Sequence, residues 1–183
     1  MEADWEFEIG PGAPVIDAHW SGYIDLRAHP EQAAQLPEAS QFPALASALV
    51  QLNAPPSPVW TSKCDLWCVD LSETPLDSLE MDTPSNALAA AHACYIDILA
   101  RQPLQWPLYE DAANFCRALC ARLRIPSLHC TRVDLIIRRA VLVAGEESFG
   151  VTAYLTACGA SEVESAQILA LALTAFAEIA AAT

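Results

Sequence analysis

Apolar and polar residues along this chain follow two different periods. Near-alternation predicts strands, and apolar residues spaced three and four apart predict helices. The expected strands are Trp5–Ile9, Val15–Trp20, Tyr23–Leu26, Val59–Leu71, His129–Val143 and Phe149–Cys158. The expected helices are Phe42–Leu52, Thr83 to about Arg101, Pro107 to just before Pro126, and Glu162 to about Ala181.

Residues at the ends of the expected helices support these assignments. Thr83 followed by Pro84 is a favourable helix start, with threonine as N-cap and proline at the first helical position. Ser161 precedes Glu164 by three residues, which is the spacing of a capping box. The last helix is apolar on nearly every side, so we expect it to be the most buried helix or half of an oligomer interface.

The order of the elements predicts the fold class. Strands, a helix, a strand, two helices, a hairpin and a final helix follow one another without regular βαβ alternation. Residues 144–148 read as the hairpin loop. We therefore expect an α+β fold in which helices pack on one face of a mainly antiparallel sheet. The length, the absence of repeats and the absence of a convincing linker predict a single domain over residues 1–183.

Successive side chains of a strand point to opposite faces of its sheet, which sorts the candidate residues. In the segment after Pro58, we expect Trp60, Cys64 and Leu66 to face the helices and Lys63, Asp65 and Trp67 to face away. If the strands are neighbours, the outer face gathers Asp17, His19, Lys63, Asp65, Trp67, Arg132, Asp134, Arg138 and Tyr154. Two interpretations stay open: cross-strand ion pairs, or a binding face on which Trp67 and Tyr154 supply stacking area.

Charge narrows the classes of partner. The net charge of −14 excludes a uniformly basic nucleic-acid surface and disfavours attraction to an anionic membrane. The charge is uneven, because residues 1–82 are strongly acidic whereas residues 101–139 are rich in arginine. Either the two segments pack together and neutralise each other, or an acidic body carries a basic patch for an anionic group.

The seven cysteines invite a metal or nucleophile hypothesis, which the sequence context weakens. Cys64 and Cys68, like Cys116 and Cys120, have zinc-compatible spacing but lie inside apolar segments. Cys130 beside a histidine is the best candidate nucleophile, although neighbouring residues of a strand point apart. We therefore expect free thiols and no metal or other cofactor. No signal sequence is recognisable and the longest apolar run is too short to cross a bilayer, which predicts a cytosolic location.

These patterns favour a non-catalytic binding or adaptor protein of a bacterial-type cytosol. We expect it to form a homodimer and to present its mixed-charge sheet face to a protein or peptide partner, and the acidity of the chain favours a basic partner. In acidity, size and element order the chain is similar to small secretion chaperones and to toxin-neutralising immunity proteins. The alternative is a small metal-dependent hydrolase or nuclease-like enzyme. Its metal ligands would be Asp17, Asp65 and Asp134, and Arg132 or Arg138 would hold an anion.

Overall fold

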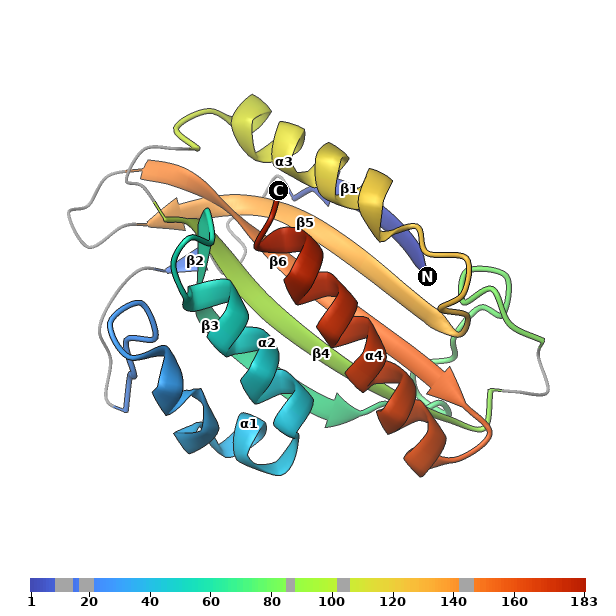
Figure 1. Cartoon of the computed structure of the whole chain (residues 1–183). Coiled ribbons are helices and arrows are strands. Elements are labelled where there is room, and N and C mark those ends of the chain that lie inside the picture. The colour runs from blue at the N-terminus through green and yellow to red at the C-terminus, as the bar shows by residue number, and fades with distance from the viewer. Residues whose placement is uncertain (9–14, 17–21, 85–87, 102–105, 142–146) are drawn as a thin grey trace.

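The computed structural model describes residues 1–8, 15–16, 22–84, 88–101, 106–141 and 147–183 (Figure 1). Its strands are β1 (Glu2–Phe7), β2 (Val15–Ile16), β3 (Val59–Cys68), β4 (Ala90–Ala100), β5 (Thr131–Val141) and β6 (Glu147–Gly159). Its helices are the 3-10 helix η1 (Pro30–Gln35) and the α-helices α1 (Pro37–Gln41), α2 (Pro43–Asn53), α3 (Tyr109–Leu123) and α4 (Glu162–Ala180).

The strands form one mixed sheet in the order β1-β5-β6-β4-β3, with β2 also pairing with β5. The expected α+β class is confirmed. A mainly antiparallel sheet is wrong, because β1 and β2 both run parallel to β5, whereas the β5/β6, β6/β4 and β4/β3 pairs are antiparallel. Parallel neighbours need a long crossover, and pairing of β1 and β2 with a strand more than 100 residues further along the chain leaves no local sequence pattern.

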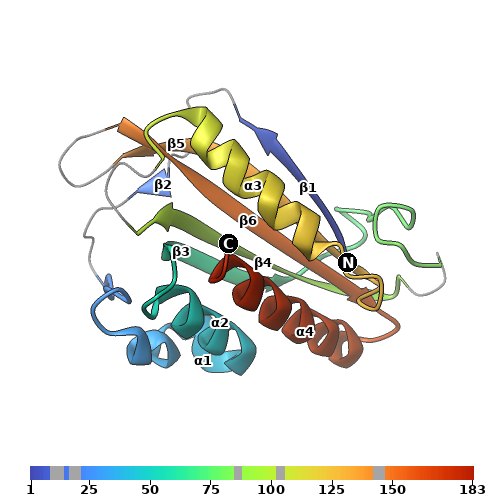
Figure 2. The same cartoon turned by 45° about the horizontal axis from the view of Figure 1, so that its top comes forward.

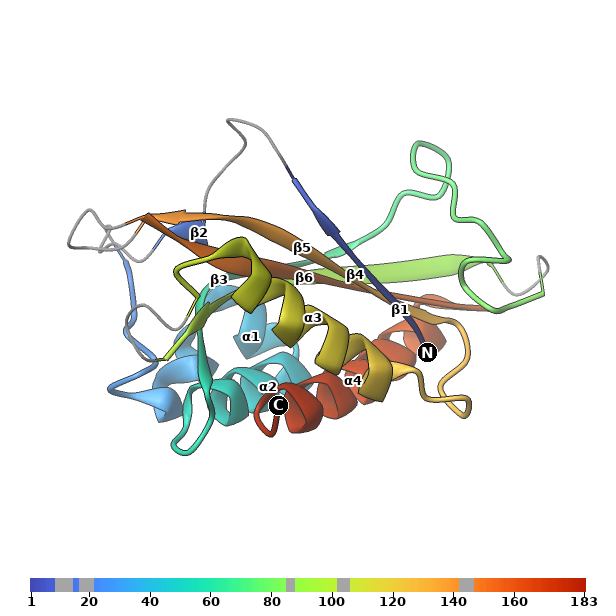
Figure 3. The ribbon, with the colours of Figure 1, turned by 90° about the horizontal axis from the view of Figure 1, so that it is seen from above.

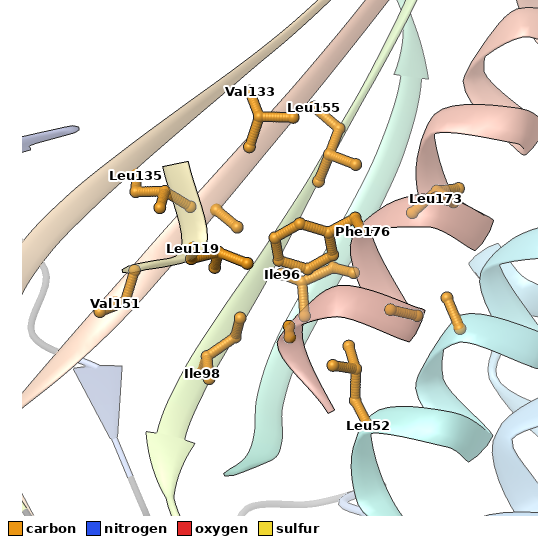
Figure 4. Close-up of a cluster of buried hydrophobic side chains, with 14 of the residues drawn as sticks. Leu52, Ile96, Ile98, Leu119, Val133, Leu135, Val151, Leu155, Leu173 and Phe176 are labelled. Atoms are coloured by element: carbon orange, nitrogen blue, oxygen red, sulfur yellow. The ribbon is translucent and has the colours of Figure 1, made fainter. Parts of the chain in front are cut away.

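The helices α2, α3 and α4 lie along one side of the sheet (Figures 2 and 3), and Figure 3 shows that the segment after β3 rises on the other side. The core lies between helices and sheet. In Figure 4, Phe176 and Leu173 of α4 approach Leu155 of β6 and Ile96 of β4, and Leu52 of α2 closes the cluster from one side. Burying such side chains stabilises the fold by roughly 1.5–3 kcal/mol each.

One expected helix is a strand. Residues Leu88, His92, Tyr95 and Leu99 have helical spacing, yet Ala90–Ala100 forms β4. This strand lies between β6 and β3, and most of its side chains are buried on both faces. A strand buried on both faces carries few polar residues, so in β4 the polar-apolar alternation is limited to the short stretch around Tyr95 and Asp97. The expected strand Tyr23–Leu26 is also wrong, because residues 22–26 form a turn and extended loop.

A β-bulge in β3 changes which residues share a face. The register with β4 shifts between Thr61 and Cys64. Even-numbered and odd-numbered residues of β3 therefore exchange sides of the sheet at the bulge. Trp60 is therefore not on the helix side as expected. It pairs with Leu99 and packs with Ala140 on the opposite side of the sheet. Beyond the bulge, Cys64 and Leu66 pack against the core on the helix side, as their alternation predicted.

Candidate binding face

The side of the sheet that α2, α3 and α4 leave uncovered carries most of the polar side chains of the strands; we call it the polar face. Strand register aligns its residues in rows. The central row runs Asp4, Asp134, Tyr154, Tyr95 and Asp65 from β1 to β3. The row on one side of it runs Glu2, Arg132, Thr156, Ala93 and Trp67. The row on the other side runs Glu6, Ile136, Thr152 and Asp97.

Three aromatic rings follow one another across β3, β4 and β6. The ring centroids of Trp67 and Tyr95 are 6.4 Å apart, and those of Tyr95 and Tyr154 are 6.0 Å apart. The planes are tilted, as aromatic pairs prefer. We call these three rings the aromatic row; Trp67 is 38% exposed, and the two tyrosines are half-buried. The row therefore offers rigid stacking area to solvent.

Both arginines of the predicted face are paired with acids. Arg132 contacts Asp134 at 2.8 Å and Glu80 at 3.1 Å. Arg138 donates to Glu8 at 2.6 Å and lies 5.9 Å from the Tyr154 ring centroid. Hydrogen bonding to Asp134 is the largest influence that raises the pKa of Arg132. Glu80 and Glu8 from the acidic part of the chain thus neutralise Arg132 and Arg138, which favours internal neutralisation over an open basic patch at these two arginines.

A cleft of about 380 Å³ opens on the polar face beside these pairs. Its floor comes from β1, β5 and β6, and its wall comes from the segment after β3, including Leu76 and Met81. The charged lining consists of Asp4, Glu6, Asp77, Glu80 and Asp134 against Arg132. Because Arg132 already contacts two of these acids, the cleft retains an excess of negative charge. Such a cleft favours the binding of a positively charged group.

A second hollow of about 570 Å³ lies at the β3 bulge. It is lined by Lys63 and Tyr95 from the sheet and by apolar side chains such as Ile24, Leu26 and Leu36. Its lining is more apolar than that of the acidic cleft. Because Tyr95 belongs to the aromatic row, the hollow adjoins the polar face and offers room for an apolar group.

Asp97 is a buried acid on this face that the sequence interpretation missed. It is 7% exposed, and its Oδ1 accepts a 2.6 Å hydrogen bond from the Thr152 hydroxyl. Burial raises the pKa of Asp97, while the Thr152 hydrogen bond and the charges of Lys63 and Arg138 oppose that rise. The apolar spacing of this segment predicts a helix and therefore hides Asp97 and Tyr95. Period-two alternation in the Tyr-Ile-Asp-Ile stretch was the signal that could have placed them on a strand.

The predicted residues of β3, β5 and β6 that the structure describes lie on the polar face, although they do not form one compact cluster. Asp134 and Tyr154 are register partners, whereas Asp65 is three strands from Asp134. At about 4.8 Å for each step between strands, that is about 14 Å along the sheet. Carboxylates that bind one cation lie about 2.0–2.6 Å from it, so Asp65 and Asp134 cannot share an ion. Asp17 and His19 lie outside the described residues.

Cysteine and histidine positions bear on the metal and nucleophile hypotheses. Within the described ranges, no group of three or more His, Cys, Asp or Glu residues is placed to hold a metal ion. Cys116 and Cys120 are buried in the core on α3. His129 is 3.0 Å from Asp82, and the thiol of Cys130 is 3.0 Å from the Thr83 hydroxyl. The neighbouring histidine and cysteine therefore have different partners.

Comparison of the chain with protein-family models, with curated proteins and with solved structures finds no match. Among helices in the described part of the chain, α4 is the one long and apolar enough to cross a membrane, a criterion that the core helix of a soluble protein also meets. Here Leu173 and Phe176 of α4 pack in the core against the sheet.

Proposed function

We propose that this protein is a non-catalytic binding protein whose polar face takes a basic segment of a partner protein or peptide. The acidic cleft beside the exposed aromatic row carries this proposal. The cleft has volume for a long side chain, negative charge and an aromatic residue, Tyr154, in its floor. A guanidinium or ammonium group in the cleft meets carboxylates and a ring face together.

The aromatic row supplies the second part of the contact. Trp67 and the tyrosines beside it are residue types that dominate binding energy at interfaces, because they bury large area with few rotatable bonds. The row runs across the strands from the cleft toward β3. A basic segment crossing the sheet would therefore place a cation in the cleft and apolar groups over Trp67.

Cytosolic location and a homodimer remain predictions. All seven cysteines are free thiols in the structure, which supports a reducing compartment. Leu171 and Val163 are exposed apolar residues on α4. They supply apolar area for the predicted self-association, which sedimentation at varied protein concentration would test.

The proposed function is tested by a binding titration with two matched peptides. One is a short arginine-rich peptide, and the other has every arginine replaced by glutamate. We expect the arginine peptide to bind and the glutamate peptide not to bind, with affinity falling as salt increases. Glu6→Lys, in the cleft, should weaken binding at least about tenfold, and Trp67→Ala should weaken it by a similar factor.

Matched controls separate a site from general attraction to an acidic protein. Glu178→Lys makes the same charge change on the helix side, and Val50→Ala trims an apolar side chain of α2 that is 36% exposed, close to the 38% of Trp67. Neither control should alter the affinity by more than about twofold. Equal binding of both peptides, or equal loss with Glu6→Lys and Glu178→Lys, would overturn the proposed function.

A further inference from the structure

On the helix side of the sheet, a cysteine, a histidine and a serine form a chain of short contacts. Cys68 of β3 and His92 of β4 are register partners. The Cys68 Sγ lies 3.2 Å from His92 Nε2, and His92 Nδ1 lies 2.8 Å from the Ser165 hydroxyl of α4. Cys68 is exposed, whereas His92 and Ser165 are buried. A nucleophile, a base and an orienting group therefore lie in sequence from the surface inward.

The hydrogen bonds of Ser165 determine which nitrogen of neutral His92 carries the proton. Ser165 Oγ donates to the Glu162 carbonyl at 3.1 Å, because a carbonyl oxygen can only accept. Serine has one hydroxyl proton, so its oxygen must accept from His92 Nδ1–H. The lone pair of neutral His92 is then on Nε2, the atom that faces the Cys68 thiol. His92 is therefore oriented to accept the thiol proton.

The other cysteines lack this arrangement. Burial raises the pKa of Cys64, Cys116 and Cys158 to about 12 and that of Cys120 to about 11, and it also raises the pKa of Cys94. A thiol with a raised pKa holds its proton and reacts slowly. Cys130 is half-buried, and its thiol contacts the Thr83 hydroxyl and not an imidazole.

We propose that Cys68 is a reactive thiol that undergoes exchange with small disulfides, with His92 as the base. His92 Nε2 takes the thiol proton, and the Cys68 sulfur attacks one sulfur of the disulfide. A new S–S bond forms as the old one breaks. The departing thiolate takes the proton from the imidazolium, so Cys68 is oxidised as the leaving sulfur is reduced. Ser165 is a positioning residue that fixes the histidine tautomer.

The experiment treats the full chain with oxidised glutathione at neutral pH and follows each cysteine by peptide mass spectrometry. We expect the first glutathione adduct to form on Cys68. In Cys68→Ser, no cysteine should form an adduct as fast as Cys68 does in the wild-type protein. His92→Gln, which has no ring nitrogen to accept the proton, should slow the reaction at Cys68 about tenfold, since an unassisted thiol is only a few per cent thiolate at this pH. Ser165→Ala should also slow it, and Ser165→Thr, which retains the hydroxyl, should restore the rate.

Melting temperatures of the variants verify that each is folded before its rate is compared. An unchanged Cys68 rate in folded His92→Gln would overturn the proposal. If His92→Gln does not fold, the position of the first adduct in the wild-type protein still tests the proposal. A first adduct on any other cysteine would contradict it. The site is on the opposite side of the sheet from the acidic cleft, so these results are independent of peptide binding.

Discussion

At the scale of single residues, Asp97 has surroundings unlike those of a surface acid. Its carboxylate is buried beside the Thr152 hydroxyl, and burial raises its pKa. The folded state therefore binds this proton more tightly than the unfolded chain does. The contribution of Asp97 to the free energy of unfolding consequently falls as pH rises above about 3.8, the ordinary value for this group, and through its raised pKa.

Asp97→Asn tests this linkage. The amide keeps an oxygen that can accept from Thr152 but carries no charge to desolvate. We expect the free energy of unfolding of this variant, relative to wild type, to increase as pH rises from acidic to neutral, measured by urea denaturation.

Asp70→Asn is the control of opposite sign. Hydrogen bonds from the Ser72 side chain and backbone lower the pKa of exposed Asp70, so its ionised form stabilises the fold at neutral pH and that contribution is lost on acidification. Its replacement should therefore be destabilising near neutrality and less so in acid. If the two variants show the same pH trend, the account of Asp97 is wrong.

Alternation along single strands placed many candidate residues correctly on a face. Asp65 and Trp67 on β3 and Asp134 on β5 lie on the polar face that their alternation predicted. Trp60 does not, because the bulge between Thr61 and Cys64 reverses the facing of the strand before it. A bulge depends on the partner strand, so alternation within one segment could not reveal it.

At the scale of elements, α4 was the helix most fully specified by local sequence. Ser161 accepts a 3.2 Å hydrogen bond from the Glu164 backbone N–H, and the Glu164 carboxylate accepts from the Ala160 N–H. The expected serine cap is confirmed. This cap also fixes the helix turn that carries Ser165.

Ser161→Ala should lower the free energy of unfolding by about 1 kcal/mol, because it leaves a helix N–H without its acceptor. Ser161→Asp, which retains an acceptor, should lose less. The matched control is Thr174→Ala in the exposed part of α4, where we expect a change within about 0.5 kcal/mol. Chemical denaturation measures all three, and an equal loss for Ser161→Ala and Thr174→Ala would contradict the capping role.

The misassigned element, β4, shows the limit of local patterns. Its alanines and its spaced apolar residues favour a helix, and Thr83-Pro84 has the residues of a helix start. Pairing with β6 on one side and β3 on the other overrides those preferences. Tyr95 and Asp97, both central to the polar face, were missed for this reason.

At the scale of the whole molecule, charge and topology act together. β1 brings Asp4 and Glu6 beside β5, and the segment after β3 brings Glu80 to Arg132. The sequence shows the unequal charge of its two halves but not this pairing, because strand order depends on contacts between distant segments. The acidic cleft is a product of that order, and so composition alone could not locate it.

We propose that the polar face, and not the helix side, is the docking surface for a basic segment. The most direct measurement is the change in backbone amide NMR shifts when the arginine-rich peptide is added. We predict the largest changes at Asp134, Tyr154, Tyr95 and Trp67 and in residues 76–81, with the exposed residues of α2 and α4 unchanged. Changes concentrated on α2, α3 or α4, or spread evenly over both sides of the sheet, would contradict the claim.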